Sequence, residues 1–268
     1  MPIFVTAFVF LLLLPAIAFA DVDVDKANAL LKEGKSFEAL KIVSPCLDAD
    51  ATDKLSNLED CLYYGEKIAE IAVYNLDTQY QNIADNNKEN ELANLFKPYK
   101  DLGIEPKWEK PLRDVRIYYD HDFFKRLSTL YPESKYKGEV EYLFIRLDAH
   151  YTKWEQWNRK LEKLVRDYPN DSFIVKAKFD LALNYDNLWA FTHPKYDLSF
   201  FDEPERFPKN NKKSEEYKQK ALKLYKEILN TQDRRSLDKW EIRDVEKRVA
   251  DIPKGIFNKR IHILSGYH

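Results

Sequence analysis

The chain has 268 residues, enough for a sizeable hydrophobic core and for one or two domains. Its 43 basic and 45 acidic side chains nearly cancel, so the overall charge excludes a strongly basic protein and predicts no nucleic-acid partner. A total of six glycines suits an all-helical chain better than a β-sandwich.

The first twenty residues, MPIFVTAFVFLLLLPAIAFA, contain no charged side chain and end in the small-x-small pattern Ala18-Phe19-Ala20. This pattern predicts a secretory signal peptide over residues 1–20, cleaved after Ala20. We therefore expect a periplasmic or secreted protein that is not integral to the membrane after cleavage. The alternative is an uncleaved anchor, because residues 3–20 are mostly apolar and reach the short end of the length that spans a bilayer.

Apolar residues recur at helical spacing along most of the remaining chain. Helices are predicted at 25–33, 36–47, 55–75, 88–101, 111–130, 136–152, 155–168, 172–189, 212–230 and 237–250. The segment 102–111 contains two prolines and a glycine and interrupts the pattern. The sequence therefore predicts N-terminal helical repeats over 21–103 and C-terminal repeats over 104–268.

Cys46 and Cys61 are the two cysteines of the chain. Each falls on the apolar stripe of a predicted helix, and the polar segment 48–53 separates the two helices. In an antiparallel helix pair folded near that segment, the two side chains lie at about the same height. A disulfide closing a loop of about fifteen residues in an oxidising compartment would stabilise the fold by about 3 kcal/mol. Two small buried thiols are the alternative.

A Tyr-Pro hinge between two apolar-patterned runs occurs twice, in RLSTLYPESKYKGEVEYLFI at 126–145 and in LEKLVRDYPNDSFIVKAKFDLAL at 161–183. Proline ends the first helix of each copy, because the residue before a proline is pushed out of the α region. A helix pair of this kind cannot bury its apolar face alone, so neighbouring pairs are expected to stack. The two copies match at one offset of 37 residues, with Leu127, Tyr131, Pro132 and Tyr142 against Leu164, Tyr168, Pro169 and Phe179.

The segment KANALLKEGKSFEALKIVSPCL at 26–47 resembles a tetratricopeptide repeat (TPR). Gly34 matches the turn glycine, Phe37 the turn aromatic and Ala39 the small residue where the two helices touch. The chain is also distantly similar to the TPR lipoprotein of the outer-membrane protein assembly machinery, in which an insertion precedes a helix like ALKLYKEIL at 221–229, but it has no lipobox cysteine. The resemblance implies an all-α fold of stacked helix-turn-helix repeats, a TPR-like α-solenoid, and a role in the cell envelope.

The segment NLWAFTHPKYDLSFFDEPERFPKNNKK at 187–213 is an aromatic insertion that breaks the repeat pattern. A loop of this length inside a compact array is often functional. Its aromatic side chains are therefore candidate partner-binding residues, namely Trp189, Phe191, Tyr196, Phe200 and Phe201. The alternative is that they fill a groove or cover an edge of the core.

The motif YYDHDFF holds Asp120, His121 and Asp122. Consecutive residues on a helix point about 100° apart, so these three side chains cannot converge on one metal or substrate. Metal sites on a single helix use ligands four residues apart, and no two histidines have that spacing. The sequence therefore predicts no catalytic residue, no metal site and no cofactor, and the protein is expected not to be an enzyme.

These patterns predict an exported TPR-like scaffold or adaptor that binds another envelope protein or a peptide segment, without catalysis. The rival prediction is a carbohydrate-binding module or envelope hydrolase that uses carboxylates and clustered tryptophans, with Trp154, Trp157 and Trp189 stacking on sugar rings. The exposure of the tryptophans distinguishes the two predictions. A scaffold buries Trp157, whereas sugar stacking needs at least two tryptophans lining one open cleft.

Overall fold

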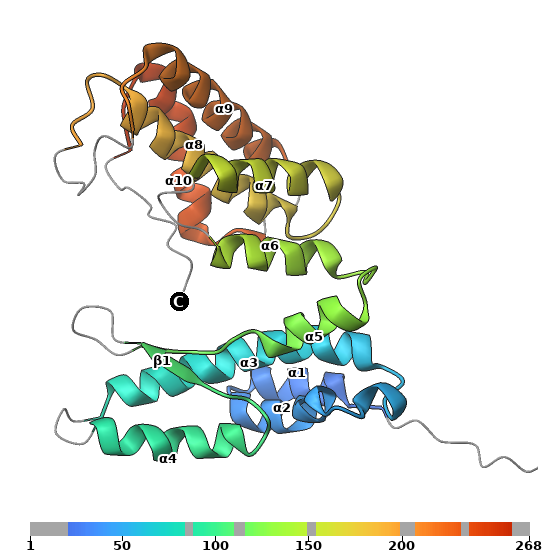
Figure 1. Ribbon diagram of the computed structural model, residues 1–268. Coiled ribbons are helices and arrows are strands. Elements are labelled where there is room, and N and C mark those ends of the chain that lie inside the picture. Colours follow the sequence, from blue (N-terminus) through green and yellow to red (C-terminus); the bar gives the residue numbers. More distant parts are fainter. Residues whose placement is uncertain are drawn as a thin grey trace, which may run out of the picture. The chain divides into compact units, whose positions relative to one another are not determined.

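The computed structural model describes residues 21–83, 88–109, 116–148, 154–198, 207–231 and 236–258, and these residues are mostly helical (Figure 1). The predicted helical class is confirmed, with one two-stranded sheet added to it. The chain divides into two compact units, Met1–Tyr131 (unit 1) and Pro132–His268 (unit 2). The described part of the chain holds no helix that is long and apolar enough to cross a membrane.

Unit 1 is organised around one long helix, α3 (Leu58–Gln81), against which α1, α2, α4, α5 and strand β2 all pack (Figure 1). One stripe of α3 is buried, as its apolar spacing predicts. The other elements of unit 1 are α1 (Val24–Lys32), α2 (Ser36–Val43), the 3₁₀ turns η1 (Ser44–Leu47) and η2 (Ala51–Asp53), α4 (Lys88–Lys100), β1 (Lys107–Glu109), β2 (Arg116–Tyr118) and α5 (Asp122–Leu130).

Helices α1 and α2 form a tight hairpin around Gly34, the residue that the sequence places at the turn. Gly34 has φ of +78°, a left-handed conformation that strains residues with a Cβ. Ala39 is fully buried, and the ring of Phe37 lies 4.9 Å from that of Tyr99 in α4. This helix hairpin therefore has the turn and the close helix contact that residues 26–47 predict.

Cys46 and Cys61 lie at disulfide distance, as predicted, with their Cα atoms 6.3 Å apart. The predicted helix 36–47 ends earlier than expected, because α2 stops at Val43 and the chain continues as η1. Pro45 lies at the start of η1, where it removes a backbone donor that a continued α-helix would need. The disulfide therefore joins a 3₁₀ turn, rather than a second helix, to α3.

The predicted helix 111–130 is wrong over residues 116–121, where the structure has strand β2 and then helix α5 from Asp122; residues 111–115 lie outside the described residues. Strands β1 and β2 are antiparallel, with Trp108 opposite Ile117. The side chain of Ile117 is buried, and its amide donates to Oδ1 of Asp77 at 2.8 Å. Contact with α3 therefore holds this short segment extended. Because β2 and α5 both pack on α3, they belong to unit 1, which ends at Tyr131 of the first Tyr-Pro hinge.

Unit 2 is a series of helices in which each packs against the next along the chain: α6 with α7, α7 with α8, α8 with α9, and α9 with α10 (Figure 1). Helix α7 ends directly before Tyr168-Pro169, as the hinge predicts. The elements are α6 (Lys137–Leu147), α7 (Trp154–Asp167), α8 (Ile174–Thr192), α9 (Asn211–Asn230), α10 (Lys239–Asp251) and the 3₁₀ turn η7 (Ile252–Lys254).

Helix α8 is the centre of unit 2, and nearly all of its residues are buried. A helix buried on all sides must also bury its polar residues, and these need partners. Asp180 accepts a hydrogen bond from the Tyr142 hydroxyl at 2.6 Å. Asp186 accepts from Nε of Arg248 at 2.6 Å and from its Nη2 at 2.9 Å. Charged and hydroxyl groups from α6 and α10 thus satisfy the carboxylates of the central helix.

Candidate functional site

The aromatic residues predicted to bind a partner fall into three groups. Trp189 and Phe191 are buried in α8, exposed by 2% and 0%. Phe191 stacks on Trp154 with ring centroids 4.9 Å apart, and Trp189 lies 4.7 Å from Phe257. Tyr196 is half-buried and packs against Phe191 and Phe257. Phe200 and Phe201 lie outside the described residues. The first two residues thus cover the core of unit 2, which is the alternative role considered for this segment.

The tryptophans of the sugar-stacking hypothesis are also buried. Trp154, Trp157 and Trp189 have exposed fractions of 3%, 2% and 2%. The indole of Trp157 donates to the carbonyl of Ile145 at 2.8 Å, so its polar atom is satisfied inside the unit. Since none of the three presents an open face, the structure offers no support for the sugar-binding alternative at these residues.

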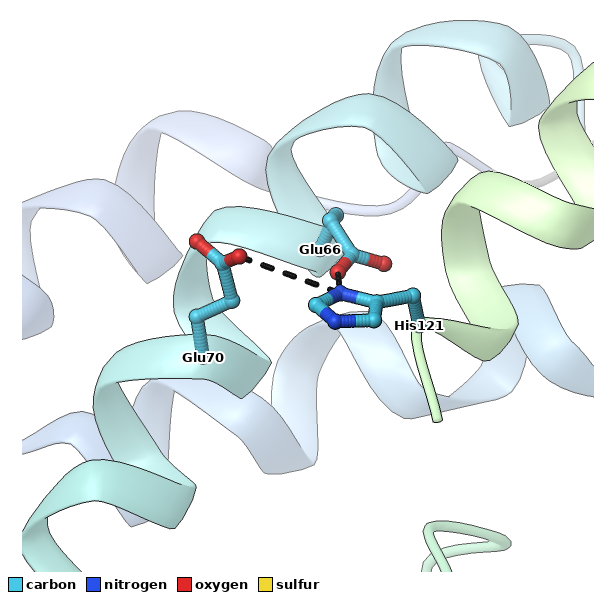
Figure 2. Close-up of side chains that lie close together, drawn as sticks. All are labelled: Glu66, Glu70 and His121. Atoms are coloured by element: carbon cyan, nitrogen blue, oxygen red, sulfur yellow. Dashed lines mark hydrogen bonds and ion pairs between the residues drawn. The ribbon is translucent and has the colours of Figure 1, made fainter. Parts of the chain in front are cut away.

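Asp120 and His121 of the YYDHDFF motif precede helix α5, so the helical geometry expected of the motif does not apply to them. Asp120 pairs with Lys107 of β1 and with Lys125 of α5, on the side of the motif exposed to solvent. His121 instead turns toward α3 and meets carboxylates that come from more than fifty residues earlier in the chain (Figure 2). The motif therefore contributes one member to a cluster that local spacing does not reveal.

Glu66 is the buried centre of this cluster. Its side chain is 1% exposed, and its Oε1 lies 2.6 Å from Nδ1 of His121 (Figure 2). The other oxygen, Oε2, accepts hydrogen bonds from the Tyr119 hydroxyl at 2.6 Å and from the Phe124 amide at 3.1 Å. Burying a carboxylate is costly unless it is paired and hydrogen-bonded. These three partners meet that requirement and fix the direction of the Glu66 carboxylate.

Glu70 adds a second carboxylate one helical turn after Glu66, on the same side of α3 (Figure 2). Its Oε1 lies 3.8 Å from Nδ1 of His121, and its side chain is 44% exposed. One donor atom from each of Glu66, Glu70 and His121 lies within 4.8 Å of the others. The cluster thus brings two carboxylates and one imidazole together, buried on the Glu66 side and open on the Glu70 side.

The segment from β2 to α5 reaches these residues because it runs antiparallel to α3. At one end the amide of Ile117 is bonded to Asp77, and at the other the amide of Phe124 is bonded to Glu66. His121 lies between these two anchors with φ of 58° and ψ of 43°, immediately before α5 begins. This left-handed backbone is uncommon for a residue with a side chain, although histidine is among those that adopt it more often.

Burial and charge act in opposite directions on His121. Burial disfavours the imidazolium and lowers the pKa of His121, but the hydrogen bond and the negative charge of Glu66, with the charge of Glu70, outweigh it, so the pKa is raised above 6.5. Burial also raises the pKa of the Tyr119 phenol well above its ordinary value, and the adjacent Glu66 charge raises it further. Tyr119 is therefore a fixed hydrogen-bond donor to Glu66 at neutral pH.

In unit 2, burial raises the pKa of two carboxyls on α8. The pKa of Asp180 is raised by burial, although Arg146 and the Tyr142 hydroxyl lower it. The pKa of Asp186 is likewise raised by burial, although Arg248 lowers it. Both carboxyls lie deep in the unit with close partners, so we assign them to the core of unit 2.

Sequence reasoning missed Glu66 and Glu70 as candidate ligands. They stand four residues apart on a predicted helix, which is the spacing expected of two ligands on one face. No two histidines of the chain have that spacing. Two carboxylates at that spacing are a weak signal in a chain with 45 acidic residues.

Comparison of the chain with protein-family models, curated proteins and solved structures finds no match.

Proposed function

We propose that the protein is an exported helical-repeat scaffold of the TPR type, an α-solenoid that holds a polypeptide partner in the cell envelope. The order of helix packing carries the proposal. Each helix of unit 2 from α6 to α9 packs against the helix that follows it, and α1, α2 and α3 do the same in unit 1. Packing in chain order is what stacked helix pairs require, because each pair buries its apolar face against its neighbour.

Two observations support a location outside the cytoplasm. A disulfide between Cys46 and Cys61 is stable in oxidising compartments and rare in the cytosol. The apolar first twenty residues have the pattern of a secretory signal. Together they support export and argue for a partner in the same compartment, either an envelope protein or a peptide segment.

Exposed apolar side chains suggest where such a partner would bind. In unit 1, Ile71 and Tyr74 lie one turn apart on α3 and are 42% and 69% exposed, and Trp108 on β1 is 53% exposed. Trp108 pairs with Ile117, whose amide is bonded to Asp77 on the turn of α3 that follows Tyr74. The three side chains therefore belong to one region of unit 1. Exposed aromatic side chains of this kind supply much of the binding energy at protein interfaces.

Site-specific photocrosslinking in the envelope of the source organism tests the proposal. A photoreactive phenylalanine analogue is placed at Tyr74 or Trp108, and the matched control position is the exposed Lys247 on α10. We expect the same envelope protein to be crosslinked from both test positions and not from the control. The double variant Tyr74→Ser/Trp108→Ser should then fail to recover that protein, with its helicity unchanged.

The same experiment addresses the partner-binding residues that the sequence predicts. Crosslinks from positions 200 and 201, together with loss of the partner in Phe200→Ser/Phe201→Ser, would move the binding surface to the aromatic insertion and leave the scaffold function in place. If no position yields a protein adduct, the proposal of a polypeptide partner is wrong.

A further inference from the structure

We propose that Glu66, Glu70 and His121 form a binding site for a divalent transition-metal ion of the zinc type, with the remaining coordination position open to water. This metal site is independent of the scaffold function, because its three ligands are not among the side chains proposed to bind the partner. Four features support it: the kind of donor atoms, the distances between them, the hydrogen bonds that hold Glu66, and the exposure of Glu70 to solvent.

The donor set matches the preference of zinc-like ions. Zinc binds imidazole nitrogen and carboxylate oxygen, and sites with three protein ligands keep a further position for water. A site built from oxygens alone would favour magnesium or calcium, whereas the imidazole of His121 shifts the preference toward zinc and its neighbours. Two carboxylates and one imidazole therefore define the class of cation.

The spacing of the donor atoms is close to what one ion requires. Zinc ligands lie about 2.0–2.2 Å from the metal, so in tetrahedral geometry they lie roughly 3.3 Å from one another. The observed separations bracket that value, because Nδ1 of His121 is 2.6 Å from Glu66 and 3.8 Å from Glu70, and no pair exceeds 4.8 Å. The 3.8 Å separation joins His121 to Glu70, whose side chain is 44% exposed and projects from α3 beside the imidazole (Figure 2).

The short contact between Glu66 and His121 marks the position that an ion would take. An ionised carboxylate only accepts hydrogen bonds, so with Glu66 ionised Nδ1 of His121 carries the hydrogen that bonds Oε1 of Glu66. A metal ion replaces that proton, since a ligating imidazole must offer a nitrogen lone pair, and the remaining hydrogen then resides on Nε2. Binding thus releases one proton when the histidine starts as the imidazolium and forms no covalent product.

The surroundings support Glu66 as a ligand. Its Oε2 is held by the Tyr119 hydroxyl and the Phe124 amide, which leaves Oε1 directed at His121. Hydrogen-bonded carboxylates of this kind are usual around metal ligands, and removing such support weakens metal binding by about 10–100-fold. Lys125, one turn after His121, forms ion pairs with Asp120 and Asp122, so its charge is partly neutralised.

Isothermal titration of the mature chain with Zn²⁺, followed by Co²⁺ substitution and visible absorption, tests the site. We expect one ion per chain. Glu70→Gln and His121→Asn should each weaken binding at least tenfold, and Tyr119→Phe should weaken it about 10–100-fold. Asparagine at 121 keeps the left-handed backbone accessible, and Glu70 is exposed, so both variants should fold.

The matched controls are Glu38→Gln on the exposed side of α2 and His193→Asn after α8, both of which should bind as the wild type does. Failure to bind zinc in the folded wild-type chain overturns the proposal. So does a stoichiometric ion whose affinity is the same in Glu70→Gln and His121→Asn as in the wild type, because that ion lies elsewhere. Loss of the ion in the His193→Asn control alone would place it in unit 2 and also overturn the assignment.

Discussion

Gly65 on α3 tests the packing between α3 and α5 most directly. A Cβ added at residue 65 would lie 2.5 Å from Cε1 and 2.6 Å from Cδ1 of Phe123. Phe123 has no exposed surface, so its ring has no solvent to move into. Gly65→Ala is therefore expected to displace the ring of Phe123 and the first turn of α5.

Two opposing effects set the size of the stability change in Gly65→Ala. Alanine is favoured over glycine in a helix interior by about 1 kcal/mol. Overpacking a filled core costs about 1–3 kcal/mol. Because the approach to two ring atoms is far shorter than a van der Waals contact, we place the strain at the upper end of that range. The free energy of unfolding of unit 1 should fall by about 1–2 kcal/mol.

Urea unfolding followed by circular dichroism measures the change, and hydrogen exchange of the α3 amides assigns it to unit 1. The matched control is a double-mutant cycle with Phe123→Leu, which removes the ring atoms that the new methyl group meets. The two substitutions should couple favourably by about 1 kcal/mol. A Gly65→Ala variant as stable as the wild type, or more stable, would refute the reasoning, because the methyl group would then have room.

Three further predictions concern charges and the disulfide. Arg248→Met leaves Asp186 buried without its guanidinium partner and should destabilise unit 2 by about 3–5 kcal/mol, measured by urea unfolding. Adding Asp186→Asn to that variant should restore part of the loss. An unchanged unfolding midpoint in Arg248→Met would contradict this. Reducing the Cys46–Cys61 bond should lower stability by about 3 kcal/mol, measured with and without reductant against a Cys46→Ser/Cys61→Ser chain, which should not respond. Burial raises the folded-state pKa of Asp180 above 3.8. The stability that Asp180 contributes relative to Asp180→Asn is therefore present at low pH and is lost as the pH rises through that raised pKa. A stability difference between the two proteins that stays constant from acid to neutral pH would contradict this.

The sequence predicted most of the helices because their signals are local. Helix α9 runs over Asn211–Asn230, against a prediction of 212–230, and α7 over Trp154–Asp167, against 155–168. In both, a long apolar stripe at helical spacing identifies the element. The Tyr-Pro dipeptides also marked helix ends correctly, since a proline acts on the residue beside it.

The hairpin of β1 and β2 was missed because nothing local identifies it. Each strand has three residues, too few for alternating polarity to be recognised. What holds β2 extended is contact with α3, through the buried Ile117 side chain and its amide bond to Asp77. Such contacts join residues forty positions apart, and periodicity cannot report them.

The aromatic insertion shows a second reason why the sequence alone does not determine which residues are exposed. Its composition fits both an exposed binding segment and a cover for the core, because the same side chains serve either purpose. For Trp189 and Phe191 the outcome is set by Trp154, Phe207 and Phe257, which surround them from other parts of unit 2. The partners of an aromatic residue, rather than its own neighbours in sequence, decide whether it is buried.

A core residue and a proposed metal ligand lie next to each other on one turn of α3, so a change in core packing is expected to change metal binding as well. Gly65 lies against Phe123, while the next residue, Glu66, binds His121 and the amide of Phe124. A shift of α5 caused by Gly65→Ala therefore moves His121 relative to Glu66. Zinc affinity should fall about tenfold along with stability, within the range expected when the support of a ligand is disturbed. In a Phe123→Leu background, Gly65→Ala should cost less stability and less zinc affinity than it does in the wild type. A zinc affinity that stays at the wild-type value while stability falls would show that His121 is held by its own contacts with α3 and not by the packing of Phe123.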